Sequence, residues 1–192
     1  LIEALCEKSP NPRCVAGAGE REALVGTWRL VYTARSNLGL EGREWLQYLV
    51  ANGPSPIQRA VLGSVSKVSR VFQTLELGEE GGRFNNFVDF RDALGGVLNL
   101  QAVVEGYTAP AQLDIRFDNA YFLFERNPLT KTPLVPPRRV PYPVPFRLLP
   151  SESRGLLDNI YVDGDLRLAR GNKGTVFILQ RDDAVEFPSG EK

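Results

Sequence analysis

Residues Asp163–Leu179, DGDLRLARGNKGTVFIL, are the stretch that says most about the fold of this chain. Two short apolar-polar runs flank Gly-Asn-Lys-Gly, a pattern typical of two antiparallel strands joined by a tight hairpin. We expect Asn172-Lys173 at the tip, so that Gly171 pairs with Gly174. Glycine at both flanking positions frees the backbone for a tight reversal. One face of the hairpin should then carry Leu166, Leu168, Arg170, Thr175, Phe177, Leu179 and Arg181.

Near the start of the chain, GTWRLVYTA at 26–34 alternates with a period of two. Trp28, Leu30 and Tyr32 share one face, which predicts a half-buried strand. Between 41–50 and 56–63 the spacing instead favours helices, and residues 1–9 and 20–24 resemble a helix tail and a single helical turn.

Further short runs, each bounded by turn residues, predict eight more strands. They are 68–77, 83–91, 97–106, 111–117, 120–126, 155–162, 165–170 and 175–181. Asp118-Asn119 fits a two-residue turn, which places Leu113, Ile115, Phe117, Phe122 and Phe124 on one apolar face. Short strands with few helices predict a mainly β protein: an antiparallel β-barrel of about eight or nine strands with short N-terminal helices.

The segment 128–150 holds eight of the chain's 14 prolines. Proline lacks a backbone N–H, so the segment cannot be a central strand. We expect a largely polyproline-like crossing segment, either a packed crossing strand or a lid over the barrel.

The chain has 192 residues, which predicts a single domain over 1–192, with a linker over 1–20 and a flexible tail over 183–192. Lys+Arg and Asp+Glu both number 23, so nothing in the charge favours a nucleic-acid partner. Cys6 and Cys14 either form a small disulfide or stay free, and we favour free thiols.

Nothing in the sequence favours catalysis. The chain has no histidine, the commonest general base and metal ligand. It also lacks a GxSxG motif, and its paired acids lie in no obvious apolar pocket. We therefore expect no enzyme activity, no catalytic residue, no metal and no cofactor.

The Gly26-Thr27-Trp28 triplet resembles the Gly-x-Trp signature of lipocalins. In that family the tryptophan lies at the closed end of a barrel, and a basic residue from the last strand packs over it. The resemblance implies that Arg181 lies over Trp28, with cation–π attraction worth about 1–2 kcal/mol.

A longer resemblance covers 24–182. LVGTWRLVYTA, RVFQTLEL, PYPVPFRLL and IYVDGDLRLARGNKGTVFILQRD occur in the order found in the PAP/fibrillin family, the plastid lipid-associated proteins. The chain departs from that pattern at Leu156-Leu157, where many relatives carry a tryptophan.

Membership implies a lipocalin-like barrel in the plastid or chloroplast, at plastoglobules, thylakoids or in the stroma. It also implies non-catalytic binding or organisation of carotenoids, prenylquinones and other lipids. The alternative is a filled barrel that coats lipid globules or assists isoprenoid-quinone biosynthesis. The expected partners are a hydrophobic small molecule or lipid, a lipid-globule or membrane surface and, in the second case, another protein.

Two sets of residues follow as candidates. The residues expected to face a ligand in the barrel interior are Tyr32, Phe72, Phe84, Phe90, Phe117, Phe122, Phe124 and Phe177. The structural signature comprises Gly26, Trp28, Asp163, Arg167, Arg170, Gly171, Gly174 and Arg181. The charged cluster of Asp163, Asp165, Arg167 and Arg170 is either a polar gate for a lipid headgroup or a salt-bridge ladder, and we favour the ladder.

Overall fold

The strands pair antiparallel into one sheet that closes on itself. A computed structural model describes residues 4, 7–34, 70–142, 153–171 and 174–187. Its elements are α2 (Ala18–Arg21), β1 (Gly26–Ala34), β2 (Arg70–Leu77), β3 (Gly82–Asp89), α5 (Arg91–Leu94), β4 (Gly96–Ala109), β5 (Gln112–Arg126), β6 (Pro133–Pro141), β7 (Arg154–Val162), β8 (Leu166–Gly171) and β9 (Val176–Arg181). The helices expected at 41–50 and 56–63 lie outside the described residues.

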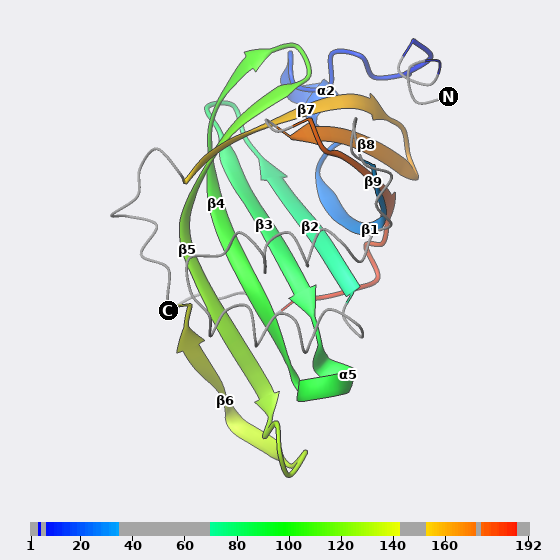
Figure 1. The fold of residues 1–192 in the computed structure, drawn as a ribbon. Coiled ribbons are helices and arrows are strands. Elements are labelled where there is room, and N and C mark those ends of the chain that lie inside the picture. The colour runs from blue at the N-terminus through cyan, green and yellow to red at the C-terminus, as the bar shows by residue number, and fades with distance from the viewer. Residues whose placement is uncertain (1–3, 5–6, 35–69, 143–152, 172–173, 188–192) are drawn as a thin grey trace.

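The strand order is β4-β3-β2-β1-β9-β8-β7-β5-β6, and β4 also pairs with β5. This last pairing closes eight strands into a barrel and leaves β6 as a ninth strand on the edge of β5 (Figure 1). The expected antiparallel barrel is therefore confirmed. Among the described residues no helix is both long enough and apolar enough to cross a bilayer.

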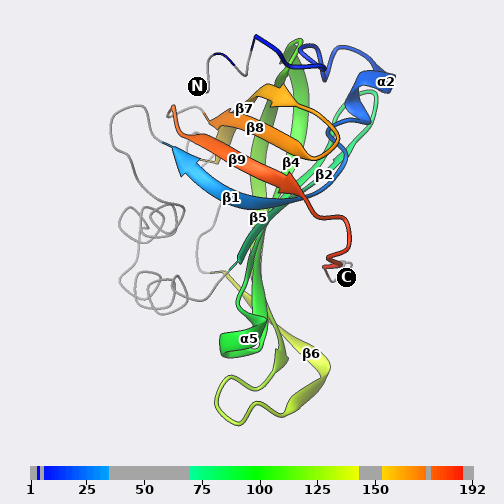
Figure 2. The same cartoon turned by 90° about the vertical axis from the view of Figure 1, so that its right-hand side faces the viewer.

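The long strands β4 and β5 carry the sheet well beyond the barrel. β5 pairs with β7 through residues 112–116 and with β6 through residues 121–126. Figures 1 and 2 both show α5 and β6 at the end of the molecule farthest from α2. We call this region the extension: α5, β6 and the adjoining ends of β3, β4 and β5.

The two-residue turn expected at Asp118-Asn119 is wrong, because 112–126 is one continuous strand. Gln101 pairs with Asn119 and Ala102 with Phe117, so Asp118 is the extra residue of a β-bulge. A bulge shifts the side-chain alternation by one residue, as the turn would have done. The predicted apolar face, with Phe117 and Phe122 on the same side, is consequently present.

The hairpin between β8 and β9 is also shifted by one residue from the expected register. The Gly171 N–H donates to the Thr175 carbonyl at 2.9 Å, so three residues separate the pair instead of two. Gly174 has φ 78°, the left-handed conformation that ends such a connection. Arg167 and Ala169 pair with Leu179 and Phe177, which lie on the inner face. The inner face of β8 therefore carries Arg167 and Ala169, and not the expected Leu166, Leu168 and Arg170.

The described part of the proline-rich segment contains an exposed edge strand, whereas a packed crossing strand or lid was expected. β6 pairs antiparallel with β5 on one side and ends the sheet on the other. Eight of its nine residues are exposed. It is thus not a central strand, as expected, but neither is it a packed lid.

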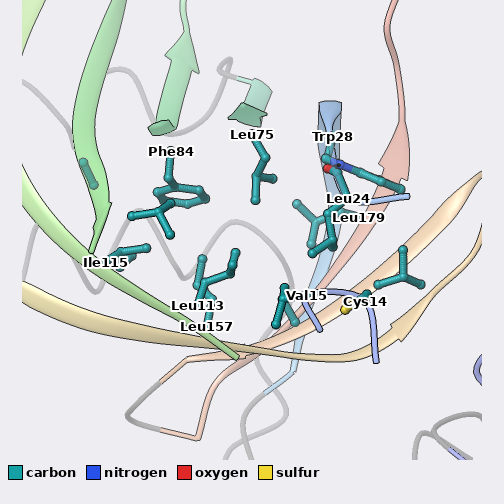
Figure 3. Packing of buried hydrophobic residues seen from close by; sticks show 14 residues of the cluster. Cys14, Val15, Leu24, Trp28, Leu75, Phe84, Leu113, Ile115, Leu157 and Leu179 are labelled. Atoms are coloured by element: carbon teal, nitrogen blue, oxygen red, sulfur yellow. Dashed lines mark hydrogen bonds between the residues drawn. The ribbon is translucent and has the colours of Figure 1, made fainter. Parts of the chain in front are cut away.

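Two apolar clusters lie on the inner face of the sheet. The closed-end cluster fills the barrel beneath the N-terminal segment (Figure 3). Its buried members are Cys14, Val15, Leu24, Trp28, Leu75, Phe84, Ala102, Val104, Leu113, Ile115, Leu157, Val162, Ala169 and Leu179. The extension cluster consists of Val71, Val88, Phe90 and Leu98, with Leu30, Leu94, Leu100, Phe122, Phe124 and Tyr142 packed against them.

Candidate lipid-binding barrel

Trp28 and Arg181 close one end of the barrel. The two residues pair across β1 and β9, and the Arg181 guanidinium lies 4.3 Å from the centroid of the indole ring. Arg181 also donates to the carbonyls of Ala23, Val25 and Gly164 at 2.7, 2.9 and 2.7 Å. The contact implied by the lipocalin resemblance is present, and it joins the N-terminal segment to the β7–β8 turn.

Gly26 is required by the same closure. Its φ is 128°, and a Cβ there would lie 2.6 Å from both Arg181 Nη1 and Asp183 Oδ1. A side chain at this position would push the arginine away from Trp28. The glycine of the signature is therefore explained by packing against Arg181.

The N-terminal segment completes the closed end from outside the sheet. Cys14 and Val15 are buried in the closed-end cluster, and the Val15 N–H donates to the Pro110 carbonyl at 2.9 Å. Cys14 carries a free thiol, as favoured from the sequence. Burial raises the pKa of that thiol to about 11, against an opposing effect of the Arg167 charge. This half of the interior is a packed core.

A layer of polar side chains lies between the two clusters, and Leu30 of β1 packs against both of them. Along β2, Gln73 lies between Val71 of the extension cluster and Leu75 of the closed-end cluster, and it pairs with Asn86 of β3. The Arg167 guanidinium, which is 0% exposed, donates to Gln73 Oε1 at 2.9 Å and to Asn159 Oδ1 at 2.8 Å.

Arg167 is buried without a carboxylate contact among the described residues. Burial lowers the pKa of its guanidinium to about 10, so the group stays charged at neutral pH. Within the described part of the chain its Nη2 atom and Asn86 Oδ1 also have no hydrogen-bond partner. Such a layer marks where the apolar filling of the barrel ends.

The extension cluster is built from aromatic rings that stay partly exposed. Phe90 lies 6.3 Å from Phe122 and 6.0 Å from Phe124, between ring centroids, and Tyr142 lies 5.7 Å from Phe122. Phe90 and Leu98 are buried, whereas Phe122, Phe124 and Tyr142 are only half-buried. Flat, half-buried aromatic rings offer apolar surface that suits a hydrocarbon ligand.

A buried carboxylate holds the start of α5 in this region. The Asp89 side chain, 1% exposed, accepts hydrogen bonds from Arg91 and from Arg70, at 2.8 and 3.4 Å to Oδ2. Burial raises the pKa of Asp89, but these contacts and the Arg91 backbone N–H outweigh it, so the pKa is lowered overall. The ion pair fixes α5 beside the aromatic rings.

Six of the eight residues predicted to face a ligand lie on the inner face. Phe84, Phe117 and Phe177 belong to the closed-end cluster or pack against it, and Phe90, Phe122 and Phe124 belong to the extension. The structure thus separates residues that the sequence grouped together.

Tyr32 and Phe72 were wrongly placed inside the barrel. A bulge between Leu30 and Tyr32 reverses the alternation of β1, so Thr33 faces inward and Tyr32 is 37% exposed. Phe72 lies on the outer face, where Phe187 of the C-terminal tail covers it at 5.1 Å between ring centroids. Phe187 also stacks on Phe87 at 4.1 Å, so residues 183–187 of the expected flexible tail pack against the sheet.

The charged cluster near 163–170 does not form the favoured salt-bridge ladder. Asp163 Oδ1 accepts the N–H groups of Asp165 and Leu166 at 2.8 and 2.7 Å, which fixes the β7–β8 turn. Arg167 points inward and Arg170 is exposed. No ion pair joins these four described residues.

Sequence reasoning missed the polar layer itself. A polar residue in the middle of an otherwise apolar inner face, as at Gln73 and Asn86, is the signal that could have revealed it. The outer face of β2–β5 also bears a groove of about 770 Å³ beside the tail, but its lining is largely polar, with Thr74, Asn85, Asn99 and Gln101. It does not suit an apolar ligand.

The closed antiparallel barrel, with a basic residue of the last strand over a tryptophan of the first, defines a lipocalin-like protein. The sequence model of the PAP_fibrillin family matches residues 1–180, so the chain belongs to this family.

A curated relative, "Probable plastid-lipid-associated protein 12, chloroplastic" of Arabidopsis thaliana, is 36% identical over 166 residues, which is 85% of this chain. Those residues span only 34% of the relative, so the chain covers about a third of that protein. No solved structure matches the chain.

Proposed function

We propose that this chain binds or organises hydrophobic molecules of the plastid, such as carotenoids, prenylquinones and other lipids, and that it does so without catalysis. The observation that carries the proposal is the half-buried ring group of Phe122, Phe124 and Tyr142 beyond the packed closed end. The family of the chain and the plastid-lipid-associated name of its relative support the plastid as its location. A place at plastoglobules or thylakoids is part of the proposal.

The polar layer defines the part of the inner face at which a ligand would bind. On one side, Trp28, Phe84 and Leu179 are fully packed. On the other side, the rings of Phe122, Phe124 and Tyr142 are only half-buried. A long apolar molecule would therefore lie along the extension, with one end near Leu98 and the polar layer.

Native mass spectrometry of the full chain, after incubation with β-carotene or with a prenylquinone, tests this proposal. We expect a bound apolar molecule, lost roughly tenfold more readily from the Phe122→Leu/Phe124→Leu variant, because each aromatic contact contributes about 0.5–1.5 kcal/mol. Phe72→Leu is the matched control, since that ring lies on the outer face. Recovery of bare wild-type protein would contradict the proposal.

The packed closed end favours a second candidate, a structural protein that coats lipid globules with its barrel filled. It predicts partition of the wild-type chain to lipid droplets without a stoichiometric ligand. Phe122→Leu/Phe124→Leu would then leave the partition unchanged.

A further inference from the structure

The extension ends in an exposed surface that is both basic and apolar. We call the stretch 126–141, which comprises β6 and the loop before it, the β6 edge. We propose that the β6 edge docks the protein on a lipid surface that bears anionic headgroups. The inference deepens the proposed function, because it names the surface through which the binding region meets lipid.

Charge is the first argument. The β6 edge contains Arg126, Lys131, Arg138 and Arg139 and no acidic residue, in a chain whose net charge is zero. The local excess of four positive charges is therefore not a property of the whole protein. Basic residues at a membrane surface each gain attraction from anionic lipids, and salt screens that attraction.

Exposed apolar side chains are the second argument. Leu129 is 91% and Val135 92% exposed, and Val140 is also exposed. Isolated exposed apolar residues are ordinary, but here they lie among cations on one projecting strand and loop. The combination of apolar side chains with surrounding Lys and Arg is the composition that inserts shallowly at a lipid interface.

A free sheet edge could also bind a strand of a second protein. The prolines of β6 argue against this alternative. Four of the nine residues of β6 are prolines, namely Pro133, Pro136, Pro137 and Pro141. Proline has no backbone N–H, so this edge offers few donors for strand addition. An unpaired edge with few donors, exposed apolar groups and cations fits a lipid surface better than another sheet.

The geometry also connects this surface to the candidate ligand site. Arg138 and Val140 pair with Phe124 and Phe122 across β5 and β6, so they share the face of the extension cluster. Arg139 points to the other face, where its guanidinium lies 3.7 Å from the centroid of the Tyr121 ring and fastens β6 to the sheet. Docking through the β6 edge would bring Phe122 and Phe124 next to lipid.

Vesicle co-sedimentation of the full chain tests the proposal. The probes are phosphatidylcholine vesicles with and without phosphatidylglycerol, at about 0.1 M and about 0.5 M salt. We expect binding to the anionic vesicles at low salt, which weakens at high salt. Arg126→Gln/Arg138→Gln should lower the partition coefficient roughly 20- to 30-fold, at about 1 kcal/mol for each cation.

A second variant tests the contribution of the exposed apolar side chains. Leu129→Ser/Val135→Thr should reduce partition roughly tenfold, since burying such side chains contributes about 1.5–3 kcal/mol each when complete. Both side chains are exposed, so the unfolding midpoint should not change. Lys8→Gln/Arg13→Gln removes two exposed charges near the N-terminus, at the opposite end of the molecule, and should alter partition less than about twofold.

The proposal would be overturned if the chain bound both vesicle types equally. It would also be overturned if both β6-edge variants bound like the wild type, or if the N-terminal control lost as much binding as they did. So would self-association of the wild-type chain through this edge without vesicle binding. The ligand measurement above stays separate, because the β6-edge variants keep Phe122 and Phe124. A chain that binds anionic vesicles but no β-carotene or prenylquinone would refute the proposed function alone.

Discussion

The closed end of the barrel and the extension share the strands β3, β4 and β5, yet they have opposite characters. At the closed end, β7, β8 and β9 lie across from these strands, and Phe84 is buried between them. In the extension the described strands lie side by side in one layer, and Phe122 stays half-buried. The same alternation of apolar residues thus produces a core in one place and a binding surface in the other.

Truncating one phenylalanine in each region gives the largest expected contrast. Phe84→Ala should destabilise the protein by about 3–5 kcal/mol, the usual range for a packed phenylalanine. Phe122→Ala should cost about 1–2 kcal/mol, because less surface is buried there. Chemical denaturation of both variants measures the difference, and equal losses would mean that the extension is as much a core as the closed end.

Removing the contact between Arg181 and Trp28 should have the next largest effect on stability. Arg181→Gln removes the cation from the Trp28 ring and the hydrogen bonds to Ala23, Val25 and Gly164. We expect a loss of about 1–3 kcal/mol of stability. Arg170→Gln is the matched control, since that exposed arginine of β8 should contribute less than about 0.5 kcal/mol. A ligand bound in the extension should be retained by both variants, and loss of ligand from Arg181→Gln would show that the two regions are coupled.

Acid should loosen the extension before the closed end. The pKa of Asp89 is lowered by folding, so its ion pair stabilises the protein above the ordinary aspartate pKa of about 4 and this stability is lost as the pH falls through the lowered value. The effect should be about 1–2 kcal/mol, because Arg70 and Arg91 are partly exposed.

Hydrogen exchange near about pH 3 and pH 6, with each profile corrected for the intrinsic rate, measures this loosening. Amides of α5 and the start of β4 should lose protection at the lower pH more than those of β1 and β9. In Asp89→Asn the extension should already be loosened at the higher pH. Equal loss of protection in both regions would rule out a local role for Asp89.

The reactivity of Cys14 is a rate, not a stability, and it reports on the closed end alone. In a Cys6→Ser background, N-ethylmaleimide at about pH 8 should modify the folded protein at least about 100-fold more slowly than the unfolded chain, since a thiol with a pKa of about 11 is ionised that much less. Phe122→Ala should not change this rate, whereas Phe84→Ala should raise it. Rapid labelling of the wild type would mean that the closed end opens readily.

Sequence predicted the barrel and its closure because both rest on residues with local signatures. Trp28 follows a glycine at the start of an alternating strand, and Arg181 ends the last strand on the matching face. The β5 face was also correct although the turn was not, since a bulge at Asp118 and a turn there shift the alternation equally. Only the pairing with β4, the strand directly before β5, distinguishes them.

The errors at Tyr32 and Phe72 have a non-local origin. Nothing in GTWRLVYTA reveals that pairing with β9 produces a bulge before Tyr32. For β2, apolar character alone favoured Phe72 inside, but Arg167 requires the amide oxygen of Gln73, and this turns Phe72 outward beneath Phe187. Each case depends on a partner more than 90 residues away, which a pattern of neighbouring residues cannot contain.

The continuity of β5 through its bulge has a mechanical consequence. Because one 15-residue strand runs from β7 of the barrel to β6, the extension cannot swing on a hinge as a separate lobe would. A molecule held by its β6 edge would stand at a set angle, with Trp28 and the N-terminal segment directed away from the lipid. Many copies docked on one lipid surface would therefore form a polarised layer, and each would present the same face to the surrounding water.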